Sequence, residues 1–157
     1  MADAITIKVE NPDQPEVAAL LKESDAYYAK LYPAESNHLL DIERLKQPKV
    51  AFHVARMGGR VVGFGSLVRH GDKYGEIKRM YLAPQARGKG IGRMLLEALE
   101  AEAVAQGFAR IRLETGQHQP EALSLYRSSG YREIGPFGMY VADPNSVFME
   151  KRLAPRR

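Results

Sequence analysis

The sequence predicts a mixed α/β fold of the α+β type, in which a central sheet of about seven strands is flanked by helices. Short runs with the period-two alternation of strands occur at both ends and in the middle of the chain. Gly58-Gly59 lies between two β-rich runs, a pattern typical of a tight hairpin. A strand, a glycine-rich loop, an amphipathic helix and a second strand then follow between Tyr74 and Glu114. Such a crossover makes its two strands parallel.

The first predicted element is a strand at Ile5–Val9, which ends at the turn signal Asn11-Pro12-Asp13. Apolar spacing then predicts three helical segments, one around Val17 to Leu21, one at Asp25–Leu31 and one at Leu39–Leu45. The remaining predicted elements are strands at Val50–Arg56, Arg60–Arg69 and Tyr74–Leu82, a helix from Ile91 that stops at Gly107, a strand at Phe108–Glu114, a helix between Pro120 and Gly130, and strands at Tyr131–Ile134 and Val147–Leu153.

Length and composition narrow the class of protein. The 157 residues are predicted to form a single domain (1–157), with a flexible tail at 154–157. The absence of cysteine excludes disulfides and thiolate chemistry, and the four histidines lack metal-ligand spacing, so no metal is expected. No leader or membrane span is visible, and the net charge of +4 is scattered. We therefore expect a soluble cytoplasmic protein that binds neither membrane nor nucleic acid.

The most informative segment is the loop Arg87-Gly88-Lys89-Gly90-Ile91-Gly92, which opens a helix. Its glycines let a ligand approach the backbone, and the unpaired N–H groups of a helix start attract phosphate. A dinucleotide fingerprint would need glycine at Arg93, and a P-loop would need Ser or Thr at Gly90. Both of these motifs fail, which leaves another phosphate loop or a plain glycine-rich turn.

Arg87, Gly90 and Gly92 occupy the fixed places of Arg-x-x-Gly-x-Gly, and this segment resembles the acetyl-CoA pyrophosphate loop of the GNAT N-acetyltransferase superfamily. The predicted element order is also similar to the GNAT order over nearly the whole chain. The resemblance implies the acyl-CoA N-acyltransferase fold, with parallel strands that splay apart at the cofactor site. It implies that acetyl-CoA, as co-substrate, contacts Met80, Tyr81, Leu82, Arg87, Gly88, Lys89, Gly90, Ile91, Gly92, Gln119 and Tyr126.

Glu76 is the candidate general base. It stands at the same spacing before Arg87 as the glutamate base of histone-acetylating GNAT members. The alternatives are a solvent-edge carboxylate, or one paired with Lys78 or Arg79, and many GNAT enzymes use water chains instead.

Tyr126 is the candidate general acid, because Leu125-Tyr126-x-x-x-Gly130-Tyr131 is similar to the family's Leu-Tyr-x-x-x-Gly-Phe element. A core tyrosine with a satisfied hydroxyl is the alternative. Gln119 stands where many GNAT members have an asparagine that bonds the pantetheine arm, and its longer amide can make the same bond.

Substrate residues are predicted from weaker patterns. Tyr32, Asn37 and His38 lie in an irregular region suited to covering a substrate, and Phe137 lies in a loop where the family places its acceptor. Arg79 could grip a carboxylate while nearby Glu76 faces an amine. Ordinary packing and loop roles are the alternatives.

These features predict an acetyl-CoA-dependent N-acetyltransferase that moves an acetyl group to a primary amine of a small molecule, by direct transfer in a ternary complex. Two alternatives stay open: a protein or peptide amine as acceptor, and a non-catalytic acyl-CoA sensor or interaction module. The family resemblance also implies a possible homodimer, with the Val147–Leu153 strand at its interface.

Overall fold

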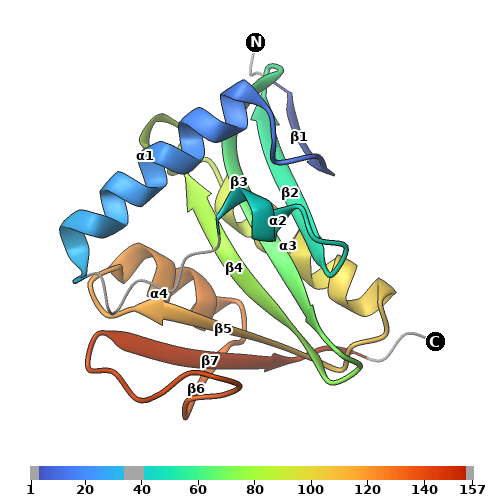
Figure 1. Cartoon of the computed structure of the whole chain (residues 1–157), viewed down its shortest axis with the longest axis vertical. Coiled ribbons are helices and arrows are strands. Elements are labelled where there is room, and N and C mark those ends of the chain that lie inside the picture. Colours follow the sequence, from blue (N-terminus) through green and yellow to red (C-terminus); the bar gives the residue numbers. More distant parts are fainter. Residues whose placement is uncertain (1–3, 34–40, 155–157) are drawn as a thin grey trace.

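The computed structural model describes residues 4–33 and 41–154, which form one seven-stranded sheet with helices on both faces (Figure 1). Residues 155–157 of the predicted tail lie outside this described part. The elements are β1 (Ile5–Val9), α1 (Pro15–Leu31), α2 (Ile42–Leu45), β2 (Val50–Met57), β3 (Arg60–His70), β4 (Tyr74–Leu82), the 3₁₀ helix η2 (Pro84–Ala86), α3 (Ile91–Ala105), β5 (Arg110–Gly116), α4 (Pro120–Ser128), β6 (Arg132–Ile134) and β7 (Ser146–Arg152).

The sheet has the strand order β1-β2-β3-β4-β5-β7-β6, and its neighbours are antiparallel except for β4 and β5. These two strands are parallel, as the crossover through α3 predicts. Their ladder runs only from the pair Gly75 and Ile111 to the pair Ile77 and Leu113. Beyond it β4 and β5 continue without pairing to each other, so they diverge. The predicted mixed sheet with splayed parallel strands is confirmed.

Each face of the sheet carries its own hydrophobic core. On one face α3 and α4 pack against the sheet, with Leu99 in the same buried cluster as Ile111. On the other face Leu21 of α1 and Leu45 of α2 pack with Phe64 of β3. Figure 1 shows α1 and α2 in front of the sheet and α3 behind it. Because both faces are covered, the strands that diverge are held in place from two sides.

α1 is one continuous helix, although the sequence predicted two segments, around Val17 to Leu21 and from Asp25 onward. Ser24 lies where the segments join and is fully buried, and its hydroxyl donates a hydrogen bond to the Leu21 carbonyl oxygen at 2.8 Å. Because this bond satisfies the polar side chain locally, the helix continues past it.

Other boundaries differ from the predictions for local reasons. β5 begins at Arg110, because the Phe108 amide donates to the Ala103 carbonyl oxygen and so closes the end of α3. β5 then continues to Gly116, since its last residues pair with β7. α2 falls within the predicted Leu39–Leu45 helix, whose first two residues lie outside the described part.

The strand at Val147–Leu153, predicted as a dimer interface, is an inner strand of the sheet. β7 pairs with β5 over its full length, and Phe148, Met149 and Glu150 pair with β6 on the other side. β6 is the outer strand at this end and has only three residues. Short edge strands discourage pairing with another chain. Only the two ends of β7 are therefore open to a partner strand.

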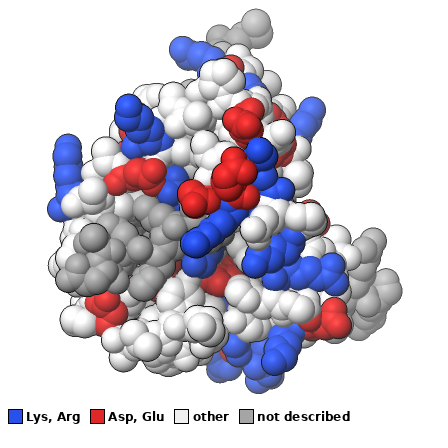
Figure 2. Space-filling view, viewed as in Figure 1, with Lys and Arg blue, Asp and Glu red and all other residues white. Residues whose placement is uncertain are grey.

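The surface charge is mixed on the face that α1 and α2 cover. Figure 2 shows Lys and Arg side chains interspersed with Asp and Glu side chains there. Within residues 4–33 and 41–154, no helix has the length and apolar character needed to span a bilayer. The same residues contain no group of three or more His, Asp or Glu side chains placed to hold a metal ion.

We expect Leu99→Ala to lower the free energy of unfolding by about 2–5 kcal/mol, because it leaves a cavity between α3 and β3. Leu99 is fully buried, and a Cβ built on Gly65 of β3 would lie 3.1 Å from its Cδ1. Met94 on the same helix is 40% exposed, so Met94→Ala is the control and should cost less than about 1 kcal/mol. Urea unfolding followed by circular dichroism measures both. Equal losses would contradict this account of the core.

Candidate functional site

The glycine-rich loop connects β4 to α3 as the sequence predicts. Gly90 caps α3 with a φ of 78°, and Gly88 has a φ of 76°. Both are left-handed conformations that cost other residues about 1 kcal/mol or more. A Cβ at either position would have no atom within 4 Å, and Lys89 between them is exposed. The loop thus offers open backbone and a cation beside the unpaired N–H groups of a helix start, which is an arrangement that binds phosphate.

Two other loop residues have their side chains in contact with the protein. Ile91 is fully buried in a cluster at the start of α3, so its side chain anchors the helix. Arg87 donates through Nε to the Leu82 carbonyl oxygen at 3.1 Å. Its guanidinium carbon lies 5.6 Å from the ring centre of Tyr27 and 5.7 Å from that of Tyr81. The charge of Arg87 is therefore held at the end of β4.

A narrow cavity of about 160 Å³ lies where β4 and β5 diverge, and we call it the slot. It is also lined by Tyr27 and Tyr28 of α1 and by residues of α3 and α4. Among the predicted cofactor residues, those that line it are Met80, Tyr81, Leu82, Arg87, Gly92, Gln119 and Tyr126. Gly88, Lys89, Gly90 and Ile91 do not line the slot itself.

The Tyr126 hydroxyl reaches into the slot and donates to the Met80 sulfur at 3.6 Å. Burial, followed by the nearby Tyr28 and Glu114, raises the pKa of Tyr126 well above its usual range. The hydroxyl therefore keeps its proton at neutral pH and can act as a donor. The ring packs edge-on against Tyr131 at 5.6 Å. Tyr126 is thus a core residue by its ring and a slot residue by its hydroxyl.

Backbone carbonyls at the end of β4 already accept hydrogen bonds from side chains. The Tyr28 hydroxyl donates to the Met80 carbonyl oxygen at 3.0 Å, and Arg87 donates to that of Leu82. Burial raises the pKa of Tyr28 to about 12, so this phenol also stays protonated. No sequence pattern singled out Tyr28 as a slot residue.

Tyr32 lines neither the slot nor the larger pocket described below, but it supports the slot residue Gln119 from behind. Its hydroxyl donates to Gln119 Oε1 at 3.1 Å and accepts from the His118 amide at 3.1 Å. A Cβ at Gly116 would overlap its ring, so glycine is needed there for Tyr32 to reach Gln119. Asn37 and His38, the other two residues predicted in this region, lie outside the described residues.

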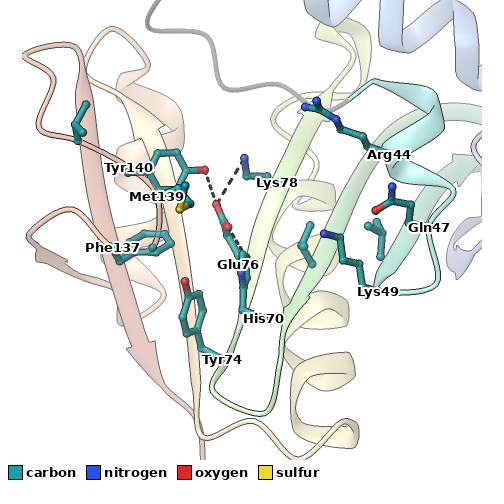
Figure 3. Close-up of a pocket in the computed structure, with 14 residues that line it drawn as sticks. Arg44, Gln47, Lys49, His70, Tyr74, Glu76, Lys78, Phe137, Met139 and Tyr140 are labelled. Carbon is teal, nitrogen blue, oxygen red and sulfur yellow. Dashed lines mark hydrogen bonds and ion pairs between the residues drawn. The ribbon is translucent and has the colours of Figure 1, made fainter.

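A larger pocket of about 610 Å³ lies on the α2 side of the sheet, and we call it the acceptor pocket (Figure 3). Its floor includes Val50, Val68 and Glu76, which are register partners on β2, β3 and β4. One wall is the segment from Arg44 to Lys49, and the opposite wall is the loop at 137–141, which contains Phe137. Phe137 is 7% exposed and packs on Tyr74 and Phe148, so it forms part of this wall.

Glu76 lies in this floor with only 1% of its surface exposed, which rules out the alternative of a solvent-edge carboxylate. His70 Nε2 lies 2.7 Å from its Oε1, and the Tyr140 hydroxyl donates to its Oε2 at 2.6 Å (Figure 3). Lys78 Nζ is 4.0 Å away. The carboxylate is thus held by three polar partners, and the half-exposed His70 links it to solvent.

Arg79 does not join Glu76 in the acceptor pocket. β4 has an extra residue opposite β3 here, because Phe64 pairs with Tyr81 but Ser66 pairs with Lys78. Arg79 adopts a φ of 56° at this bulge. Its guanidinium donates to Asp25 Oδ1 at 2.5 Å and to other groups of α1, with 4% of the side chain exposed. Bulges redirect side chains in this way.

Glu114 on β5 is a buried carboxyl group near the site that the sequence interpretation did not single out. Leu113 faces the α3 core, so Glu114 faces the opposite side, as does Arg112, the register partner of Glu76. Burial raises the pKa of Glu114 to about 7, and the Glu76 carboxylate adds to the rise. This carboxyl group therefore changes its charge near neutral pH.

Glu114 is coupled electrostatically to both cavities. After burial, its charge contributes to the raised pKa of Tyr126 in the slot and of Tyr140 in the acceptor pocket. Glu114 lines neither cavity, so it acts on these two tyrosines through its charge.

The positions of His70 and Tyr140 explain why the two residues were not found. His70 and Glu76 flank one hairpin turn, and the register pairs His70 with Tyr74 and Val68 with Glu76. That pairing places both side chains on one face, so a register argument could have found His70. Tyr140 comes from the irregular connection between β6 and β7, where no local periodicity indicates direction.

Comparison with known proteins identifies the family. The model of the Acetyltransferase (GNAT) family matches residues 17–131. An IAA acetyltransferase of Azospirillum brasilense is 50% identical over 150 residues, covering 95% of this chain and 98% of its own. A crystal structure from Klebsiella pneumoniae, described as an acyl-CoA N-acyltransferase, superposes with a TM-score of 0.81 at 38% identity, covering 96% and 98% of the two chains. PaiA N-acetyltransferase of Thermoplasma acidophilum, solved with coenzyme A, shares the fold at 23% identity and a TM-score of 0.73, with 95% and 99% covered.

The fold and these similarities define an acyltransferase with the acyl-CoA N-acyltransferase fold. The chain belongs to the GNAT acetyltransferase family, whose model covers more than half of it.

We expect the Glu114 carboxyl to make the fold less stable as pH rises. Its pKa is about 7 in the folded protein and should be close to the ordinary 4.5 when unfolded. The folded state therefore binds more protons between these values, and stability falls from about pH 4.5 to about pH 7. Glu114→Gln should remove this fall and be about 2–3 kcal/mol more stable than wild type at pH 8.

Urea unfolding between pH 5 and pH 8 measures this difference. Glu133→Gln is the control, since Glu133 is exposed on β6. Parallel stability curves for wild type and Glu114→Gln would contradict the raised pKa.

Proposed function

We propose that this enzyme transfers the acetyl group of acetyl-CoA to a primary amine of a small molecule, directly and in a ternary complex. The observation that carries the proposal is that the slot and the acceptor pocket share β4. Met80, Tyr81 and Leu82 line the slot, and Glu76 and Lys78 of the same strand line the pocket. Two substrates bound to one strand need no covalent relay on the protein.

The residues present fit acetyl-CoA. The loop from Arg87 to Gly92 offers two glycines whose missing Cβ atoms leave the backbone open, two cations and a helix start for the pyrophosphate. Met80 and Leu82 offer carbonyl groups for the pantetheine arm, and Gln119 offers an amide. When bound, acetyl-CoA supplies a thioester whose acetyl carbon an amine can attack.

Glu76 would accept the proton that the amine must lose. A primary amine is mostly protonated at neutral pH, and only its neutral form is a nucleophile. Glu76 is within 2.7 Å of His70, which can pass the proton to solvent. Lys78 nearby adds positive charge, which favours the neutral form of the amine. Glu114 is the second candidate for this role, because its pKa is about 7.

Tyr126 would protonate the departing sulfur. Its hydroxyl is protonated at neutral pH, as a tyrosine normally is, so it can donate to the sulfur as negative charge develops there. In this structure the hydroxyl already donates to a sulfur atom, that of Met80, from the position it would use.

A small acceptor is favoured over a protein. The pocket volume of about 610 Å³ lies within the usual range for small-molecule sites. Two walls and two tyrosines enclose it, and Glu76 is the only acidic residue among its described lining. A protein or peptide amine would fit a flat acidic groove better. A non-catalytic acyl-CoA sensor would have no need for the carboxyl, imidazole and phenol groups that meet at Glu76.

We also propose that the enzyme acts in the cytoplasm without binding membrane or nucleic acid. The family resemblance suggests a homodimer, which would use β6 or another surface instead of β7.

Calorimetry with acetyl-CoA, followed by a thiol-release assay on a panel of amines and short peptides, tests the proposal. Binding with thiol release on small amines supports it. Release on peptides alone favours the protein acceptor, and binding with no transfer favours the sensor.

We expect Arg87→Gln to weaken acetyl-CoA binding about tenfold or more, because it removes a charged contact to the pyrophosphate. Calorimetry with acetyl-CoA measures the change. Arg127→Gln is the control, since Arg127 is exposed on α4 and pairs with Glu133. Unchanged binding in Arg87→Gln would mean that the loop holds no phosphate.

We expect Glu76→Gln to lower kcat by about 10²–10⁴-fold and Tyr126→Phe by about 10²-fold, as general acid–base roles require. Steady-state kinetics on the best amine found measures both. Tyr131→Phe is the matched control, since its buried hydroxyl donates to Glu100 away from both cavities. If Glu76→Gln keeps full activity and Glu114→Gln loses it, the base is Glu114.

A further inference from the structure

We infer that the acceptor amine also carries an anionic group, a carboxylate or a phosphate, which Arg44 and Lys49 hold while the amine lies at Glu76. An apolar segment of the substrate would connect the two groups. This inference rests on the proposed function and narrows the class of its acceptor.

The described lining of the acceptor pocket carries more positive charges than are needed to balance its one carboxylate, Glu76. Its described lining includes Arg44, Lys49 and Lys78 but only one carboxylate, Glu76, and Lys78 is the cation beside that carboxylate. The cofactor does not account for the other two cations. Its proposed phosphate loop begins at Arg87, beyond the far end of β4 from Glu76.

Arg44 and Lys49 stand at opposite ends of the wall that faces Tyr140, and Figure 3 shows their side chains apart from each other on that wall. Among the described residues, neither side chain has an ion pair or hydrogen bond, and Arg44 bonds through its backbone, whose amide donates to Asp41 and whose carbonyl oxygen accepts from the Gln47 amide. Lys46 between them behaves differently, because its Nζ lies 3.6 Å from Asp13 and 3.7 Å from Glu43. Within residues 4–33 and 41–154, the cation outside the pocket is therefore paired and the two pocket cations are not, which suits them to bind an anion.

The floor of the pocket sets the distance between the two ends of the substrate. Val50, Val68 and Glu76 are neighbours on three adjacent strands, and Lys49 precedes Val50. Neighbouring strands lie about 4.8 Å apart, so the backbone at Val50 is about 10 Å from that at Glu76. Side chains reach inward from both ends. The amine and the anion of a fitting substrate are therefore separated by roughly 6–10 Å.

The middle of the pocket suits an apolar segment. Val50 and Val68 form the floor between the charged ends, and Met139 and Val141 stand on the rim with 98% and 76% of their surface exposed. Exposed methionine adapts its shape to apolar ligands. A charged or strongly polar segment would lose its hydration over this floor without gaining partners.

A series of ω-amino acids of increasing chain length, each compared with its neutral carboxamide, tests the inference. For the best chain length, wild type should prefer the acid over the amide about tenfold or more in kcat/KM. The Arg44→Gln/Lys49→Gln variant should lose most of this preference through a KM that rises about tenfold, with kcat nearly unchanged. Lys46→Gln is the matched control and should keep the preference for the acid. The corresponding ω-aminoalkyl phosphonates show whether a phosphate-like group can replace the carboxylate.

The possible results separate this inference from the proposed function. If wild type acetylates the amides as well as the acids, or the double variant keeps the preference, the inference is wrong while N-acetyltransfer stands. If no amine is acetylated, the anion site can still be tested by calorimetry. The measurement is the affinity of the same ω-amino acids and their amides for enzyme preloaded with coenzyme A. Tighter binding of acids than amides, lost in the double variant, would support the anion site. Equal binding would overturn it.

Discussion

The organisation of this protein depends on the early end of the β4–β5 ladder. Parallel pairing stops at Ile77 and Leu113, although both strands continue. Backbone groups beyond that point cannot pair with each other and remain available to side chains or ligands. Beyond the ladder, β4 and β5 lack hydrogen bonds to each other, and packing in the two hydrophobic cores holds them in place. Helices cover the sheet on both faces. The resulting opening puts Met80 on one cavity and Lys78, two residues earlier, on another.

The bulge at Arg79 complements this divergence. One extra residue in β4 inverts the side-chain alternation, so Glu76 and Tyr81 face the same side although their spacing is odd. Arg79 itself is anchored to Asp25 of α1, which fixes the bulge to the helix that covers it. α1 also supplies Tyr28, whose hydroxyl is bonded to the next residue of β4, Met80. One helix therefore fixes both the strand geometry and one wall of the slot.

Sequence patterns predicted the framework well because its signals are local. Alternation, the Gly58-Gly59 turn and the Arg87–Gly92 loop each act through neighbouring residues, and the strands and loop formed where they indicated. The contacts of the site are mostly non-local, and there the sequence was less informative. Glu114 looks like any strand carboxylate until burial and Glu76 raise its pKa. Arg79 could not be placed without the bulge, which depends on the register with β3.

The side-chain bonds to the β4 carbonyls have a consequence for ligand exchange. Tyr28 and Arg87 satisfy the oxygens of Met80 and Leu82 in the protein alone. A ligand that pairs with these oxygens exchanges one set of hydrogen bonds for another, so this contact adds orientation but little net affinity. When the ligand leaves, the same two side chains can bond the strand again and lower the cost of its departure. The end of β4 is thus hydrogen-bonded by the protein itself whether or not a ligand is present.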